Sequence, residues 1–269
     1  NDMQNMMGRI RRCAEDYNMI AEGDKIAVGV SGGKDSLTLL YLLAALRRYY
    51  PAHYELQAVT IDMGLPGMDF SPVAALCEKL EVPYQIKKTE IGPIIFDYRH
   101  EKNPCSMCAK MRRGALNDVL LTLGCNKIAL GHHFDDAVET FLMSLLYEGR
   151  IGCFEPVTYL SRTGITQIRP MLYIGEQAIA HFAGRYELPV VHNVCPADKH
   201  TKRQEVKVLL RRLMRENPNI ENSIFRSIHA VALDTMPGYK SEGVEHSFLE
   251  RFHAQAVSYT HLRAHETRH

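Results

Sequence analysis

The sequence predicts an α/β protein with a doubly wound parallel sheet, an N-terminal helix and a C-terminal helical extension. Short apolar, β-branched runs alternate with longer segments whose apolar residues recur at helical intervals. Such alternation favours a parallel sheet covered on both faces, and right-handed crossovers leave few topologies. Ligands of these sheets bind at the carboxyl ends of the strands, so polar residues at those positions are the candidates for function.

The first half of the chain contains three strand signals. Apolar residues at helical spacing, among them Met6 and Ile10, predict a helix over residues 3–20 before the sheet. Apolar runs predict strands over 25–30, 56–62 and 83–89. The stripe from Leu37 to Leu46 predicts a helix over 36–49, and a second helix is expected over 73–80. Residues 92–104 have no periodic pattern, so we expect irregular structure there.

The second half continues the alternation more weakly. Helices are expected over 108–123, 136–147, 176–186 and 201–215, and strands over 127–130 and 166–168. We therefore divide the chain into an N-terminal helix (1–24), an α/β domain with a Cys-x-x-Cys insertion (25–198), a basic helical extension (199–240) and a tail (241–269). The tail holds four histidines after residue 252 and lacks apolar periodicity, so we expect it to lie outside the fold.

Composition excludes several classes of protein. The 269 residues are 46% hydrophobic and 23% charged, which is typical of a globular chain and not of a disordered or fibrous one. Apolar runs of about 20 residues and a signal-peptide pattern are both missing from the sequence, so we expect a cytoplasmic protein without a membrane partner. The net charge of +1 does not exclude a nucleic-acid partner, because phosphates bind to local basic surface.

The phosphate loop, defined as Ser31-Gly32-Gly33-Lys34-Asp35-Ser36, separates the first strand from its helix. Paired glycines permit a tight turn, and the helix N-terminus, Lys34 and the serine hydroxyls favour an anion. Val28 and Asp35 stand where a Walker A loop needs Gly and Ser or Thr, so the loop is of another kind. The alternative is a glycine-rich turn that binds nothing.

A second polar cluster, Gly131–Thr140, also follows a strand and opens a helix. Asp135 or Asp136 is a candidate Mg²⁺ ligand beside the phosphates. The alternative is a capping box with Asp136 as N-cap and Glu139 at the third helical position, which needs no ligand. The paired histidines of this cluster are open as Zn²⁺ ligands, although their spacing does not require it.

Seven cysteines, an odd number, argue against a disulfide framework. Cys105 and Cys108 lie within one helical turn, where they fit a redox dithiol, half of a zinc site, part of an iron–sulfur site, or two buried thiols. Cys195 is a third candidate ligand, since three thiolates leave one iron of a [4Fe–4S] cluster open. The remaining four lie in or beside apolar segments and are expected in the core: Cys13, Cys77, Cys125 and Cys153.

Two basic segments are candidates for RNA binding. Residues 199–215 hold seven Lys or Arg and one acid, and Arg203, Lys207 and Arg211 share a helical face. Lys110, Arg112 and Arg113 follow the cysteine pair directly. The alternative is an ordinary solvated face.

These motifs, taken in order, resemble the PP-loop ATP pyrophosphatase superfamily and, within it, the tRNA 2-thiocytidine synthetase (TtcA) family. The resemblance rests on SGGKDS, Cys-x-x-Cys followed by AKMRRG, GHHFDD, Arg169-Pro-Met-Leu and a late single cysteine, over about residues 1–235. It implies an enzyme that uses ATP, Mg²⁺ and a [4Fe–4S] cluster to thiolate the cytidine at position 32 of the tRNA anticodon loop. It also implies a cysteine desulfurase as sulfur source, and a homodimer is left open.

The resemblance also implies roles for residues. Lys34, Asp35 and Asp136 would be catalytic, and Asp136 would hold Mg²⁺. The ATP site would comprise the phosphate loop with Ile61, Asp62, Gly131 and Arg169, although Arg169 alternatively orients an RNA phosphate. The cluster would be held by Cys105, Cys108 and Cys195.

Three other functions fit part of the pattern. A PP-loop uridine thiolase would differ in the base alone. A tRNA ligase of the lysidine synthetase type would share the ATP site and need no cysteine trio. A nucleotide-binding or metal-sensing module would bind ATP without cleaving it.

Overall fold

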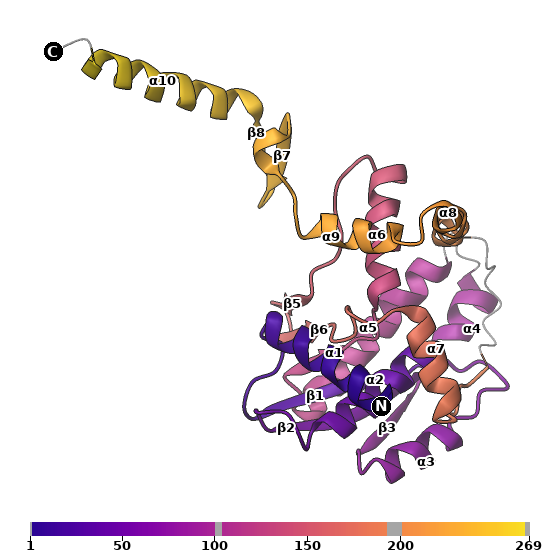
Figure 1. The fold of residues 1–269 in the computed structure, drawn as a ribbon. Helices are drawn as coiled ribbons and strands as arrows, with labels where there is room; N and C mark the ends of the chain where they lie inside the picture. Colours follow the sequence, from indigo (N-terminus) through magenta and orange to yellow (C-terminus); the bar gives the residue numbers. More distant parts are fainter. Residues whose placement is uncertain (1, 100–103, 193–200, 267–269) are drawn as a thin grey trace. The chain divides into compact units, whose positions relative to one another are not determined.

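The computed structural model describes residues 2–99, 104–192 and 201–266, with the backbone alone for 97–99 and 264–266. The chain forms two compact units, Asn1–Glu221 and Asn222–His269. The first contains the predicted sheet and its helices (Figure 1).

A six-stranded sheet forms the centre of the first unit. The strands are β1 (Asp24–Gly29), β2 (Tyr54–Asp62), β3 (Tyr84–Lys88), β4 (Lys127–Ala129), β5 (Val157–Leu160) and β6 (Ile165–Ile168). Their order in the sheet is β3-β2-β1-β4-β6-β5. All pairs are parallel except β5 with β6. The predicted doubly wound α/β class is confirmed, and the antiparallel edge strand β5 is an addition that the sequence pattern did not predict.

The strand order creates a switch point beside β1. The chain runs from β1 outward to β2 and β3, and then returns to place β4 on the other side of β1. Val28 of β1 pairs with Ala129 of β4, and Gly29 pairs with Val59 of β2. The loops that follow β1 and β4 therefore start at the same end of the sheet, where the parallel strands finish. Sheets of this kind bind ligands in the crevice between two such loops.

Helices cover both faces of the sheet. They are α1 (Asp2–Asp16), α2 (Lys34–Leu46), α3 (Ser71–Lys79), α4 (Ile91–Pro93), α5 (Pro104–Leu123), α6 (Phe134–Tyr147) and α7 (Glu176–Arg185), with a π-helix over Ile94–Arg99. Helix α8 (Lys202–Glu216) contacts α6, and α9 (Ile220–Ile228) begins at the end of this unit. Helix α2 contacts α1 and α7, whereas α5 packs through Val119 and Leu120 onto Ala27, Val59 and Ile128 of three strands. Burying these apolar side chains on both faces is the main stabilisation of the unit.

Two helical predictions differ from the structure, and the prediction for the apolar stripe of α8 agrees with it. The N-terminal helix ends at Asp16 and not near residue 20, although Met6, Ile10 and Cys13 are buried as the periodicity predicts. Of residues 92–104, expected to be irregular, the part up to residue 99 lies in α4 and the π-helix. In α8 the apolar stripe faces inward, since Val206 and Leu210 are buried. Among the described helices, none has the length and apolar composition to cross a membrane.

The second unit contains most of α9, a 3-10 helix over Leu233–Thr235, a hairpin and a C-terminal helix. Strands β7 (Gly238–Ser241) and β8 (Val244–Ser247) pair antiparallel, and α10 (Phe248–Glu266) follows. The expected tail at 241–269 is thus helical over most of its length, with exposed apolar residues such as Phe252 and Leu262. The lack of apolar periodicity there agrees with a helix that buries no face within this unit.

Candidate active site

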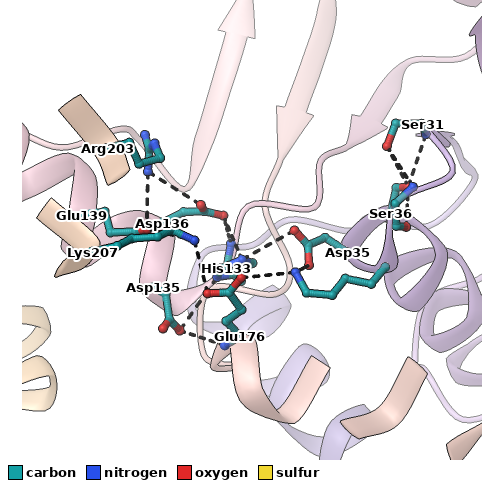
Figure 2. Close-up of polar contacts among 12 residues, drawn as sticks. Ser31, Asp35, Ser36, His133, Asp135, Asp136, Glu139, Glu176, Arg203 and Lys207 are labelled. Atoms are coloured by element: carbon teal, nitrogen blue, oxygen red, sulfur yellow. Dashed lines mark hydrogen bonds and ion pairs between the residues drawn. The ribbon is translucent and has the colours of Figure 1, made fainter. Parts of the chain in front are cut away.

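The phosphate loop leaves the carboxyl end of β1 in a conformation that requires glycine. Gly32 has a φ of +89°, and a Cβ atom at this position would lie 2.8 Å from Cβ of Val191. Ser36 Oγ accepts a hydrogen bond from the Ser31 N–H at 3.2 Å (Figure 2) and donates to the Gly33 carbonyl at 3.2 Å. The loop is therefore held tight by its own hydroxyl and backbone groups.

The loop presents the N-terminus of α2 to the crevice. Gly33 is the N-cap and has no side chain with which to cap the first turn. The first N–H groups of α2 consequently remain available for an anion, and the helix dipole adds partial positive charge. This geometry fits a polyphosphate.

Gly131 brings the second polar cluster against the phosphate loop. A Cβ atom at Gly131 would lie 3.4 Å from both the backbone carbon and Cβ of Asp35, and from the nitrogen of Ser36. A larger residue would push the two loops apart. Gly131, two residues after the end of β4, thus lets the two loops lie close together.

A chain of alternating charges runs from the phosphate loop to α8, and we call it the charged network (Figure 2). Its members lie on α2, on α6 and the residue before it, on α7 and on α8: Lys34, Asp35, His133, Asp135, Asp136, Glu139, Glu176, Arg203 and Lys207.

At the α2 end, Lys34 and His133 share Asp35. Lys34 Nζ lies 3.0 Å from Asp35 Oδ1, and His133 Nε2 lies 3.6 Å from Asp35 Oδ2. Burial opposes the charge of Asp35, but His133 and Lys34 outweigh it and hold the pKa of Asp35 below its ordinary value. Burial likewise opposes protonation of His133, yet Asp35 and Asp136 raise its pKa.

At the α8 end, two cations face carboxylates of α6 and α7. Lys207 Nζ lies 3.5 Å from Glu139 Oε1 and 3.4 Å from Glu176 Oε2. Arg203 Nη1 lies 3.7 Å from Asp136 Oδ1 and 3.9 Å from Glu139 Oε2. Two of the residues predicted to bind RNA, Arg203 and Lys207, are therefore paired with carboxylates of the protein, although both side chains stay partly exposed.

Glu139 is the most buried member of the network. Its side chain is 1% exposed, and neither carboxylate oxygen has a hydrogen-bond partner among the described residues. Burial raises the pKa of Glu139 to about 7, which Lys207 and Arg203 oppose only in part. Glu139 therefore exchanges a proton near neutral pH.

Glu176 links the two ends and was not predicted as a site residue. It opens α7, donates its backbone N–H to Asp135 Oδ1 at 2.8 Å, and lies 3.3 Å from Lys34 Nζ. Burial acts to raise the pKa of Glu176, but Lys207 and Lys34 lower it overall. A Gly-Glu pair at a helix start, soon after the end of a strand, is the signal that could have identified it.

The capping-box alternative with Asp136 as N-cap is wrong. Helix α6 begins at Phe134, so His133 is the N-cap and Asp136 occupies the third position. Asp136 Oδ2 accepts the backbone N–H of His133 at 2.9 Å. Asp136, in the first turn of the helix, therefore accepts the N–H of the N-cap residue with one oxygen. Its other oxygen faces Arg203.

Ile61 and Asp62, expected beside the adenosine, end β2 on the other side of β1. Ile61 is partly buried against the core that α5 covers. Asp62 Oδ1 accepts the N–H of Gly64 at 2.9 Å, and its carbonyl accepts the N–H of Thr89 at 2.9 Å. These bonds fix the backbone at this edge.

Arg169, expected to bind phosphate, is held by the chain itself. It is 8% exposed, and its Nη1 donates to the Glu155 carbonyl at 2.6 Å and to Thr158 Oγ1 at 3.1 Å. Its guanidinium lies over the ring of Phe154. A direct contact between Arg169 and a phosphate stays a prediction.

Two of the three candidate cluster ligands lie at the N-terminus of α5. Cys105 is exposed and Cys108 is partly buried, whereas Cys195 lies outside the described residues. No group of three metal-binding side chains occurs within the described ranges. Lys110, Arg112 and Arg113 are exposed on the same helix. Of the other cysteines, Cys13, Cys77 and Cys125 are buried and Cys153 is partly buried.

Comparison with known families identifies this arrangement. The family model described as the PP-loop domain matches residues 4–214. The chain belongs to the PP-loop family. Among its relatives, the tRNA-cytidine(32) 2-sulfurtransferase of Geobacter metallireducens is 40% identical over 222 residues, which cover 81% of this PP-loop chain and 86% of the relative. That of Pelobacter propionicus is 41% identical over 225 residues, covering 82% and 84%. The predicted membership of the TtcA family is confirmed.

A solved structure shows the same PP-loop fold. The U34-tRNA thiolase NcsA from Methanococcus maripaludis, solved with its [4Fe-4S] cluster, superposes with a TM-score of 0.70. The match covers 89% of this chain and 81% of that chain at 24% sequence identity. At this identity the likeness supports the fold.

Proposed function

We propose that this PP-loop protein 2-thiolates the cytidine at position 32 of tRNA, through an adenylated intermediate. The relatives that carry this name align with about four fifths of the chain. The observation that carries the proposal is that the phosphate loop and the cysteine pair both lie at the end of the sheet where the parallel strands finish.

Topology brings the cysteine pair to that edge. Helix α5 leads directly into β4, so it runs antiparallel to the strand, and its first residues lie at the edge where the parallel strands end. Leu116 of α5 contacts the end of β1, since a Cβ atom on Gly29 would lie 3.6 Å from Leu116 Cδ2. Cys105 and Cys108 lie further toward the N-terminus of the same helix.

Chain connectivity limits the distance of Cys195 from the phosphate loop. The backbone N–H of Val191 donates to the Gly32 carbonyl at 2.8 Å. Cys195 is the fourth residue after Val191, and an extended chain covers at most about 14 Å in four residue steps. This limit supports Cys195 as the third ligand of a cluster held with Cys105 and Cys108.

The residues present fit ATP and Mg²⁺. The uncapped α2 N-terminus, the serine hydroxyls and Lys34 suit the β- and γ-phosphates. Asp135 and Asp136 each use one oxygen to cap a helix start and retain acceptor capacity for a hard cation. Ile61 and Asp62 would border the adenosine.

The first step is adenylation of the base. The cytidine is flipped from its stack, because its C2 carbonyl is otherwise unreachable. The O2 oxygen attacks the α-phosphate, the bond to the β-phosphate breaks, and pyrophosphate leaves. Lys34 and the loop N–H groups stabilise the developing charge, and Asp35 and Glu176 fix the Lys34 ammonium.

The second step replaces oxygen with sulfur. A sulfur at the oxidation level of sulfide forms a bond to C2, and the C2–O bond breaks as AMP leaves with the oxygen. This exchange at C2 changes no oxidation state. Persulfide sulfur from a desulfurase would first have to be reduced to sulfide by two electrons, and an external thiol would be the reductant. A [4Fe–4S] cluster held by Cys105, Cys108 and Cys195 would supply this sulfur.

The wider reaction needs partners that the chain does not itself contain. A cysteine desulfurase system would supply sulfur, and tRNA phosphates would bind exposed cations such as Lys110, Arg112, Arg113 and Arg211. We place the protein in the cytoplasm with its tRNA and ATP, and a homodimer is compatible with this scheme.

The test is mass spectrometry of tRNA nucleosides from cells with and without the gene, repeated with protein purified without oxygen. We expect 2-thiocytidine to depend on the gene. Cys105→Ser abolishes it together with bound iron, whereas the buried Cys77→Ser retains both. Unchanged 2-thiocytidine contradicts the proposal. Gene-dependent 2-thiouridine would identify a uridine thiolase, and an amino-acid adduct would identify a ligase.

A further inference from the structure

Three side chains form a stack at the β4 side of the crevice, which we call the His132 stack. The His132 and Phe154 rings have centroids 5.2 Å apart at an interplanar angle of 41°. The Arg169 guanidinium carbon lies 5.2 Å from the centroid of the Phe154 ring. The outer member, His132, is exposed, whereas Arg169 is buried.

All three members lie at the edge where the parallel strands end. His132 follows β4, and Arg169 follows β6 directly. Phe154 precedes β5, which runs antiparallel to β6, so the start of β5 lies at that same edge. Three separate segments thus converge on one stack.

The base of the stack is rigid. Arg169 is fixed by Glu155 and Thr158, and its backbone N–H donates to the Pro156 carbonyl at 3.1 Å. Rotation of the guanidinium would break two of these bonds in a buried place, which is costly. Phe154 is therefore held in position, and His132 is supported by it.

The stack lies across the phosphate loop from the expected adenosine site. His132 is the residue after Gly131, which approaches Asp35 and Ser36 closely. In the sheet, β2 and β4 flank β1 on opposite sides. If the adenosine borders Ile61 and Asp62 on the β2 side, the β4 side is left for the second reactant.

We propose that the exposed His132 ring is the platform on which the reacting pyrimidine of an unpaired RNA loop stacks. This inference rests on the proposed function, in which a flipped base must bring its carbonyl oxygen to the α-phosphate. A flipped base loses its stacking partners, and proteins that bind unpaired RNA replace them with aromatic faces. Stacking accepts any base, so His132 positions the pyrimidine and does not select it.

The ring chemistry suits this role. Desolvation by the surrounding chain and the charge of Arg169 lower the pKa of His132. The lowered pKa favours the neutral imidazole, which presents an uncharged π face. The phenyl ring of His132→Phe should therefore still stack on the pyrimidine, whereas the methyl group of His132→Ala should not.

The experiment measures binding of a 17-nucleotide anticodon stem-loop (about the size of a natural arm) that carries a fluorescent cytidine analogue at position 32. A second stem-loop lacks the base at that position. We expect wild-type protein to quench the fluorescence and to bind the complete RNA about 10- to 100-fold more tightly than the abasic RNA, as stacking on a protein ring requires.

His132→Ala should lose the quenching and the preference for the complete RNA, and His132→Phe should retain both. His53→Ala is the matched control, because His53 is also an exposed histidine but precedes β2 at the opposite edge of the sheet. It should behave as wild type. ATP affinity should be the same in all variants.

Two results overturn the inference. One is a His132→Ala protein that keeps the wild-type quenching and preference. The other is a His132→Ala protein that loses ATP affinity instead, since the ring would then stack on adenine. Failure of the proposed function is distinguishable, because wild-type protein would then form no 2-thiocytidine in tRNA.

Discussion

Two basic segments of this chain look alike in sequence and differ in the structure. Lys110, Arg112 and Arg113 on α5 are exposed, and they have no ion-pair partner among the described residues. On α8, Lys207 and Arg203 lie within 4.0 Å of carboxylates, one of which, Glu139, is buried. A cation that neutralises a buried carboxylate is not available to a phosphate. The α5 cations are therefore expected to bind RNA, and the two α8 cations to hold α8 against α6 and α7.

The largest expected effect is on RNA binding through α5. Arg112→Ala with Arg113→Ala removes two exposed charges, so tRNA affinity should fall roughly 10- to 100-fold at low salt. The slope of log Kd against log salt should become shallower by about one to two. Fluorescence anisotropy at several salt concentrations measures both, and an unchanged slope would remove α5 from the RNA surface. Thermal unfolding is the control and should not change.

The α8 cations should affect stability instead. Lys207→Met leaves Glu139 without its nearest cation, which should cost about 1–3 kcal/mol of unfolding free energy at pH 8. The cost is limited because Glu139 takes up a proton. Urea unfolding measures it. If Lys207→Met unfolds like wild type and makes the salt dependence of tRNA binding shallower, Lys207 binds RNA and the proposed difference between α5 and α8 is wrong.

The pH dependence of stability tests the burial of Glu139. Its pKa is about 7 in the folded chain and ordinary in the unfolded chain, so between about pH 4.5 and 7 the folded state binds the extra proton. This contribution is present at low pH and is lost as pH rises, by up to about 1.4 kcal/mol per pH unit. Glu139→Gln removes it, so this variant should gain stability relative to wild type from pH 5 to pH 7.

Asp35→Asn is the matched control for that measurement. The pKa of Asp35 is lowered in the folded chain, so its contribution is present above the ordinary pKa and is lost as pH falls. Asp35 also raises the pKa of His133, so relative to wild type the variant should gain only the part of the stability that His133 loses as pH approaches 7, which is less than the gain of Glu139→Gln. A gain of equal size in both variants would contradict the assigned environments.

The smallest expected effect separates residues of one helix. Arg211 is exposed on α8 and has no ion-pair partner in the described part of the chain. Arg211→Met should lower tRNA affinity a few-fold, as loss of one phosphate contact does, and change the unfolding free energy by less than about 0.5 kcal/mol. If Arg211→Met and Lys207→Met lose the same stability, the contact of Lys207 with the buried Glu139 does not give Lys207 a larger role in stability than Arg211.

Much of the sheet could be predicted because its signals are local. The phosphate loop contains paired glycines and a polar helix start directly after an apolar run, so strand, loop and helix follow from adjacent residues. Strand β5 (Val157–Leu160) was missed because it is a short, half-exposed edge strand without an apolar run. Residues 92–104 were expected to be irregular because glycine and proline interrupt their pattern, and the part up to residue 99 is helical.

Residues of the candidate site could be predicted only where they follow a strand closely in the sequence. Asp136 could be assigned to the site because it follows β4 within a few residues. Glu176 was missed because its partner Lys34 lies 142 residues away in the chain. The domain boundaries at 198 and 240 stay predictions, and the compact units divide at 221.

The sequence by itself determined the sheet class, the glycine turn and the family, because periodicity, backbone freedom and motif order are properties of neighbouring residues. The tertiary structure decided which charges are available. Whether a lysine meets a phosphate or a buried carboxylate depends on the elements packed around it, and sequence spacing along one helix does not contain that information.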